Sequence, residues 1–336
     1  MKYAHPIVVV APLLLLSFAL PGAELKFAVQ EKTKLSKVFD GKANFHSTSI
    51  HMRVDGEDVD SPLGALTVNI EDDVHLELHD EYGALKGGKP VKLKRTFDKV
   101  EGKSVQHFEV AEEAGMKPPP DVKQTRASGI EGKTVLFTLG EDGEYKASFE
   151  DEKADTKLLE KLEEDMDLRA LLPEKSLEAD QSWDIDVPAL FSVFNVPGGQ
   201  LKLRAEGEPE NDGKLGDEMQ ENVKGKAKGT YKGSREVDGH KCAVLAIEAQ
   251  TASHGDRDDS ARTPPGGMTG IAVEFDIEGE ILWDVEAGHF HSCKLESKSK
   301  MTMKSSRKVE HNGESHEIER VTEFEGEYEF SCAVGE

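Results

Sequence analysis

The chain has 336 residues and carries 66 acidic against 42 basic side chains, a formal net charge of −24 at neutral pH. Nucleic acids and anionic membrane surfaces would repel such a protein, so neither is expected as a partner. The length allows one large or two ordinary domains, and 37% hydrophobic residues exclude a fully disordered chain.

The first 23 residues have the features of a secretory signal peptide. Lys2 precedes an almost uncharged run from Ile7 to Leu20, and the small residue Ala23 follows where cleavage is expected. The run is too short to cross a bilayer, which needs about 20 apolar residues. We therefore expect an exported protein, periplasmic or extracellular, with no transmembrane segment in the mature chain.

Residues 24–150 are predicted to form a β-rich N-terminal region. Dipeptides that favour tight turns recur along the whole chain, since Gly, Asn and Asp tolerate the positive φ that hairpin turns need. They are Asp55-Gly56, Glu101-Gly102, Glu131-Gly132, Asp142-Gly143, Asp238-Gly239 and Asn312-Gly313.

Residues 151–200 are predicted to hold a helix and a connector. From Asp155 to Leu172, hydrophobic residues recur at steps of three and four, and Pro173 ends the run. This spacing predicts one amphipathic helix that packs on a sheet face or joins two sheets. The apolar run from Val187 to Phe194 is interpreted as core packing.

Residues 201–336 are predicted to form an antiparallel meander. Between Ile271 and Val285 apolar and acidic residues alternate, as in a half-buried strand. If Asn312-Gly313 is a two-residue loop, Met301 faces Phe324 and Cys293 faces Cys332. A three-residue loop ending at Gly288 places Trp283 opposite His291 and Ile281 opposite Cys293. Both registers agree on the buried face, which a slip of one residue would swap. The fold class is mainly β, with large antiparallel sheets (a meander, curved or half-barrel) and one central amphipathic α-helix.

Three segments together resemble a group of secreted bacterial β-rich proteins of unknown function. They are Leu171–Ser176 followed by Ala179–Trp183, the hairpin Gly229–Leu245, and the strand Gly279–Asp284. Ala179-Asp180 stands where the group has Gly-Asp. The resemblance covers about residues 155–305 and implies a β-rich exported fold, with no catalytic residues.

His289, His291 and Cys293 alternate and are predicted to share one strand face. Imidazole and thiolate at this spacing can supply three corners of a zinc or copper site. The alternative is a disulfide between Cys293 and Cys332, because the predicted register brings them within disulfide reach and export favours oxidation. Cys242 is then a small buried residue.

The sequence lacks nucleophile and phosphate-binding motifs. We expect a non-catalytic binding or structural role, with a lipid-like or surface partner. An apolar ligand would contact Met301, Met303, Phe324 and Tyr328, but the pattern favours the interpretation that these side chains fill the core. The alternative is a secreted hydrolase or metal-dependent enzyme that uses His289 and His291.

Overall fold

The computed structural model describes residues 24–59, 62–112, 115, 117–151, 153–195, 198–199, 201–207, 213–256, 268–311 and 314–335. The predicted signal peptide lies outside these residues, as does the Asn312-Gly313 turn. In the described part of the chain, no helix is long and apolar enough to span a membrane.

Strands dominate the described chain, with two α-helices and three short 3-10 helices. The strands are β1 (Lys34–Val54), β2 (Glu57–Val59), β3 (Leu66–Tyr82), β4 (Leu85–Lys86), β5 (Lys89–Pro90), β6 (Lys92–Val110), β7 (Val122–Ala127), β8 (Thr134–Leu139), β9 (Tyr145–Phe149), β10 (Ser182–Asp184), β11 (Arg204–Ala205), β12 (Lys224–Val237), β13 (His240–Asp256), β14 (Met268–Asp284), β15 (His289–His311) and β16 (Glu314–Gly335). The helices are α1 (Val187–Asn195) and α2 (Lys214–Glu221), with 3-10 turns η1 (Pro62–Ala65), η3 (Thr156–Leu159) and η4 (Arg169–Leu171).

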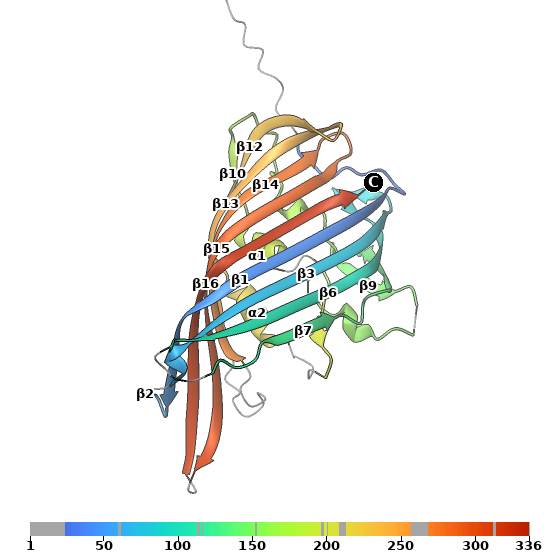
Figure 1. Cartoon of the computed structure of the whole chain (residues 1–336). Helices are drawn as coiled ribbons and strands as arrows, with labels where there is room; N and C mark the ends of the chain where they lie inside the picture. Colours follow the sequence, from blue (N-terminus) through green and yellow to red (C-terminus); the bar gives the residue numbers. More distant parts are fainter. Residues whose placement is uncertain are drawn as a thin grey trace, which may run out of the picture.

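One large open antiparallel sheet contains both the first long strand and the last strand of the described chain. Its path runs β10-β12-β13-β14-β15-β16-β1-β3-β6-β7-β11, with β2, β8 and β9 attached beside it. The last strand, β16, pairs with the first, β1, along almost its whole length. This pairing joins the N-terminal and C-terminal strands into a single curved sheet (Figure 1).

The two α-helices and the connector before them lie on one face of this sheet, here called the inner face (Figure 1). The hydrophobic core lies between them and the strands. Phe194 of α1 packs edge-on against Phe275 of β14 and Tyr328 of β16, with ring centroids 5.5 Å and 4.8 Å apart. The apolar run that contains α1 is therefore core packing, as predicted.

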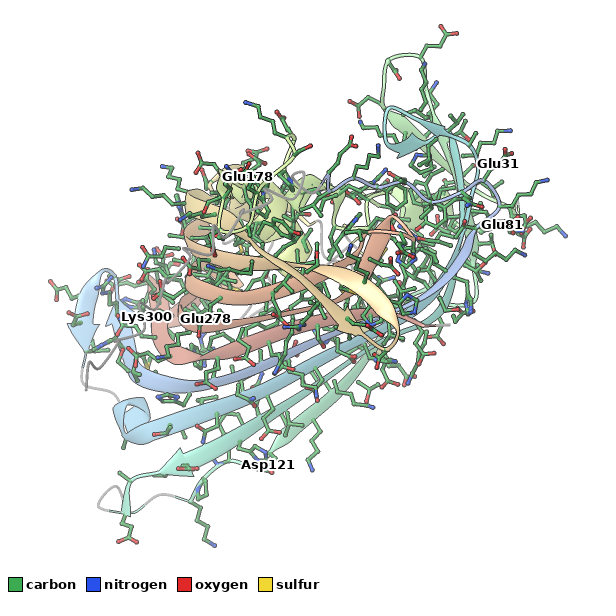
Figure 2. The ribbon with its side chains drawn as sticks, turned by 90° about the horizontal axis from the view of Figure 1, so that it is seen from above. Glu31, Glu81, Asp121, Glu178, Glu278 and Lys300 are labelled. Carbon is green, nitrogen blue, oxygen red and sulfur yellow. The ribbon has the colours of Figure 1, made fainter. Side chains whose placement is uncertain are left out.

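The opposite, outer face of the long strands is charged. In β14, Glu274, Asp276 and Glu278 are exposed while the residues between them are buried. Neighbouring strands offer partners: Lys300 of β15 lies 3.7 Å from Glu325 of β16. Glu278 and Lys300 belong to adjacent strands on this face (Figure 2). The predicted alternation of apolar and acidic residues is confirmed.

The predicted register of the C-terminal meander is confirmed for β15 and β16. Cys293 lies opposite Cys332, Leu295 opposite Phe330 and Met301 opposite Phe324, without a register shift. Between β14 and β15 the prediction is right for Ile281 and Cys293 but wrong for the residues nearer the turn.

The error in that second register comes from one additional residue in β15. The pairing shifts between Leu282 and Trp283, so Trp283 faces Phe290 rather than His291. Phe290 is fully buried and His291 is not. An inserted residue exchanges the two faces of a strand, because side chains alternate with a period of two.

The helix predicted over residues 155–172 is wrong. Only the 3-10 turns η3 and η4 form there, and Lys161 and Leu168 have φ of 62° and 58°, which interrupts a right-handed helix. Asp165 accepts hydrogen bonds from the backbone N–H groups of Asp167 and Ala170, at 3.0 Å and 3.1 Å. Such side-chain-to-backbone bonds compete with helical ones. The single central helix is replaced by an irregular connector followed by α1 and α2.

The segment just after the predicted cleavage site is part of the core. Leu25, Phe27 and Val29 are 4–5% exposed, while the residues between them are exposed. The Ala28 amide donates to the Gly288 carbonyl at 2.9 Å, and the Phe27 ring lies 5.5 Å from that of Tyr82. An extended segment thus packs across the sheet before β1 begins.

Candidate functional site

An apolar pocket of about 190 Å³ opens on the inner face beside β15 and β16. Five strands supply its apolar lining: β1, β3, β6, β15 and β16, with Met268 of β14 at one side. The apolar lining residues are Ile50, Leu66, Val68, Ile70, Phe108, Met268, Met303 and Phe324. Most of these side chains are only partly buried, so the pocket is accessible from solvent.

A bulge in β1 aims one of these residues into the pocket. The inward residues of β1 have odd numbers as far as Ser47, but the pairing with β16 shifts between Ser47 and Ser49. After the shift Ile50 is the buried residue, at 9% exposure. The Ser47 hydroxyl accepts a hydrogen bond from the Val68 amide at 2.8 Å, which fixes the bulge against β3. Without the extra residue, Ile50 would point to the outer face.

The charged side chains that line the pocket are of one sign. Gln106, Ser305 and Thr322 are neutral, and Lys304 and Arg320 are cationic, and none of the described lining residues is acidic. About one residue in five of the whole chain is acidic. The pocket therefore differs in charge from the rest of the protein surface.

Of the four residues predicted to contact an apolar ligand, two line this pocket. Met303 and Phe324 do so. Tyr328 instead packs on Phe194 of α1, and its hydroxyl donates to the Asn195 carbonyl at 3.4 Å. Met301 packs at the margin of the hydrophobic core. The pocket residues of β1, β3 and β6 were missed, because they reach the C-terminal strands only through the pairing of β1 with β16, which joins residues far apart in the chain.

A larger hollow of about 910 Å³ lies over the outer face. Its lining includes Lys224, Glu274, Lys298, Lys300 and Glu325. These are the exposed charges of neighbouring strands, some of them paired across the sheet. We regard this hollow as a solvated surface and the apolar pocket as the candidate binding site.

Deeper in the core, a buried ionic cluster connects the sheet to the connector. Lys37 of β1 donates to Asp80 of β3 at 2.8 Å and to Asp167 of the connector at 2.6 Å. Arg95 of β6 forms a two-pronged contact with Asp80, at 2.8 Å for each bond. The side chains of Lys37, Asp80 and Arg95 have no exposed area. A substrate would have to displace the connector to reach them. The cluster is therefore structural, and it holds the connector against the sheet.

Burial and pairing shift the pKa values in this cluster in opposite directions. Burial alone would raise the pKa of Asp80, but Arg95 and Lys37 outweigh it and lower this pKa to about 2. Burial raises the pKa of Glu164 to about 7, although Arg169 pairs with it. One oxygen of Glu164 is buried without a hydrogen-bond partner, which favours the protonated form. Tyr82 donates to Asp167 at 2.7 Å, and burial raises its pKa.

The predicted metal ligands are not brought together. His291 packs against His240, with ring centroids 5.3 Å apart, while a ring nitrogen of His289 is bonded to the Phe290 carbonyl at 2.7 Å. The bulge in β15 separates both from the inward face of Cys293. Within the described ranges, no three His, Cys, Asp or Glu side chains are grouped so as to hold a metal ion.

The two opposed cysteines are both buried free thiols in the structure, as is Cys242. The predicted pairing of Cys293 with Cys332 is confirmed as a register, but the disulfide bond is not formed and stays a prediction. Burial and the neighbouring Cys293 raise the pKa of the Cys332 thiol. Such a thiol is a poor nucleophile, because the thiolate is the reactive form.

A scan against protein-family models finds no match, and neither does a search of curated proteins. Among solved structures, an outer membrane channel from Pseudomonas putida F1 aligns with a TM-score of 0.24 and 9% identity, over 92% of this chain and 97% of the channel. A FadL homologue from Pseudomonas aeruginosa aligns with a TM-score of 0.23 and 10% identity, over 89% of each chain. Scores this low carry no argument about function.

Proposed function

We propose that the protein is an exported, non-catalytic binding protein that holds an apolar chain in the inner-face pocket. The observation that carries this proposal is the lining itself: eight apolar side chains face an accessible space of about 190 Å³. Concave, mostly apolar sites with a few polar groups are the usual form of ligand sites. An exposed apolar surface also favours a ligand that removes it from water.

The volume supports a slender ligand. Pockets for drug-sized molecules usually measure about 300–1,000 Å³, and this pocket is smaller. A single hydrocarbon chain matches such a space better than a ring system or a lipid with two chains. Because Val68 of β3 lies opposite Phe108 of β6 in the sheet, their side chains form one wall of the pocket.

The competing function, a metal-dependent hydrolase using His289 and His291, has no comparable support. Their side chains make separate contacts, one to a backbone carbonyl and one to another imidazole ring. A metal-activated water needs about three protein ligands on one ion.

The proposal is tested by filling the pocket. Val68→Trp should reduce the affinity for dodecanol by roughly tenfold, because the indole takes the space of about two methylene groups, worth ~0.8 kcal/mol each. The matched control is Ser148→Trp on β9, an exposed position on a strand that supplies no residue to the lining. Binding is measured by isothermal titration calorimetry, after delipidation of the purified protein.

Native mass spectrometry of the protein before delipidation provides a second readout. A co-purified single-chain lipid, absent from the Val68→Trp variant, would support the proposal. If the unmodified protein binds no dodecanol, or if both tryptophan variants bind it equally well, the pocket is not a ligand site.

A further inference from the structure

Two arginines lie beside each other on the inner face where the pocket ends. Arg320 of β16 is directly opposite Ser305 of β15, and Arg307 is opposite Ile318. Side chains alternate along a strand, so Arg307 shares the face of Met303 and Ser305, and Arg320 shares the face of Thr322 and Phe324. Diagonal neighbours in such a pair are within reach of long side chains.

Both arginines are exposed. By the register, the acidic residues on their face in the described chain are Glu57 of β2, which lies two strands from β16, and Glu314 at the start of β16. The ion pairs of this region involve Arg53 with Asp58 and Glu319, and Lys304 with Asp256. In the described part of the chain, no ion pair includes Arg307 or Arg320. The acidic neighbours Glu317, Glu319 and Glu323 alternate with the inward residues of β16 and therefore face outward.

This arrangement is unusual in a chain of net charge −24. Elsewhere on the same two strands, cations are neutralised across the sheet: Lys294 lies 3.2 Å from Glu329 and Lys300 lies 3.7 Å from Glu325. Two cations that form no ion pair with a described residue, beside an apolar lining with no described acidic residue, form a surface that complements one kind of molecule. That molecule has a hydrocarbon chain and a negatively charged end.

We infer that the ligand is a single-chain amphiphile with an anionic head group, of the fatty-acid class, whose head is bound by Arg320 and Arg307 while its chain occupies the pocket. This inference rests on the proposed function and assigns its substrate class. Guanidinium groups suit the purpose, because their planar donors bind carboxylate oxygens in pairs. Arg320 lines the pocket itself and contacts the head group directly, and Arg307 adds charge next to it.

The test compares three ligands of equal chain length: dodecanoate, dodecanol and dodecylammonium. Titration calorimetry is run on the full mature chain at low salt and below the micelle-forming concentration of each ligand. The variants are Arg320→Gln and Arg307→Gln, which remove the charge and keep a side chain of similar length. Lys300→Gln is the matched control. It removes one positive charge from the outer face of β15, the strand that also contains Arg307.

We expect dodecanoate to bind most tightly and dodecylammonium least. Arg320→Gln should weaken dodecanoate binding by about fivefold to tenfold, the size of one solvent-exposed charge-assisted hydrogen bond. Arg307→Gln should have a smaller effect in the same direction. Neither variant should change the affinity for dodecanol, and Lys300→Gln should change neither affinity. Added salt should reduce the preference for dodecanoate, because it screens exposed charges.

The outcomes separate this inference from the proposed function. If dodecanoate and dodecanol bind equally well and Arg320→Gln affects neither, the pocket holds an apolar chain but does not recognise an anion. If Arg320→Gln weakens both ligands equally, its effect is on the fold of the pocket, which also overturns the head-group assignment. If none of the three ligands binds, the proposed function fails together with the inference.

Discussion

At the scale of single residues, the buried ionic cluster contains more acid than base. Lys37, Arg95 and Arg169 face Asp80, Asp167, Glu164 and Asp165. With every group ionised the cluster would carry one uncompensated negative charge in a region that is mostly buried. Holding a proton on one carboxyl removes this charge. Glu164 is that carboxyl, because burial raises its pKa to about 7.

The raised pKa of Glu164 makes the stability of the protein depend on pH in a defined direction. Its ordinary pKa is 4.5 and its folded value is about 7, so between these values the folded chain holds a proton that the unfolded chain has released. Stability from this group is complete below pH 4.5 and is lost as the pH rises toward 7. The loss amounts to at most about 3 kcal/mol.

Urea unfolding at several pH values between about 5 and 8 checks this prediction. The Glu164→Gln variant should flatten the dependence, because glutamine is neutral at every pH. Asp80, whose pKa is lowered to about 2, contributes the opposite slope only in stronger acid and does not interfere in this range. An unchanged slope in the variant would assign the pH dependence to other groups.

The sequence contains a signal for the cluster that is visible only once the strand is known. Along β1 the inward residues are Leu35, Lys37 and Phe39, so a lysine interrupts an apolar face. The same holds in β6, where Arg95 lies between Leu93 and Phe97. Such a residue predicts a buried partner, but it does not identify it. Asp167 comes from a connector that is 130 residues away from Lys37 in the chain, and local pattern carries no information about that contact.

At the scale of elements, strands were predicted better than helices for a physical reason. The alternation in β14, β15 and β16 involves a buried face and a solvated face, and a slip of one residue would reverse them, which specifies the register strongly. The connector has the spacing of an amphipathic helix, but its second half is mostly buried, with Met166, Leu168 and Leu171 at most 1% exposed. There, carboxylates that bond the backbone and buried ion pairs outweigh helical propensity.

The segment from residue 24 to residue 30 is an element that the sequence did not reveal, because it is short and adjoins the predicted signal peptide. Its central side chain, Phe27, is 5% exposed, and the guanidinium of Arg169 lies 5.2 Å above its ring. We predict that Phe27→Ala lowers the free energy of unfolding by about 3 kcal/mol or more, through the lost burial and the cavity. Chemical denaturation of the mature chain measures this.

Lys26→Ala is the control for that measurement, since the Lys26 side chain is 61% exposed and its ion-pair partner within the described ranges is the exposed Glu24. It should change stability by less than about 0.5 kcal/mol. Equal effects of the two substitutions would mean that the segment is not part of the folded core in solution.

At the scale of the whole molecule, the pairing of β16 with β1 decides the architecture. It joins strands from opposite ends of the chain, and it places Ile50 of β1 beside Phe324 of β16 and Met303 of β15 in one pocket. The residues of the C-terminal meander that line the pocket were identifiable from alternation. Those on β1, β3 and β6 were not, because no local feature specifies a partner so distant in sequence. The bulge at Ser47 adds a change of face that strict alternation would predict wrongly.

The net charge of −24 is also a property of the whole molecule, and it leads to a final prediction. The acidic side chains of β14 and β16 cover the outer face, where they outnumber their basic partners. Their mutual repulsion destabilises the folded chain, and salt screens it. Raising sodium chloride from about 10 mM to about 500 mM should therefore raise the melting temperature, by roughly 2 °C or more.

Chloride is used because sulfate strengthens apolar burial in any protein. A fall in melting temperature would show that cross-strand pairs such as Lys294 with Glu329 contribute more to stability than the excess of acid removes.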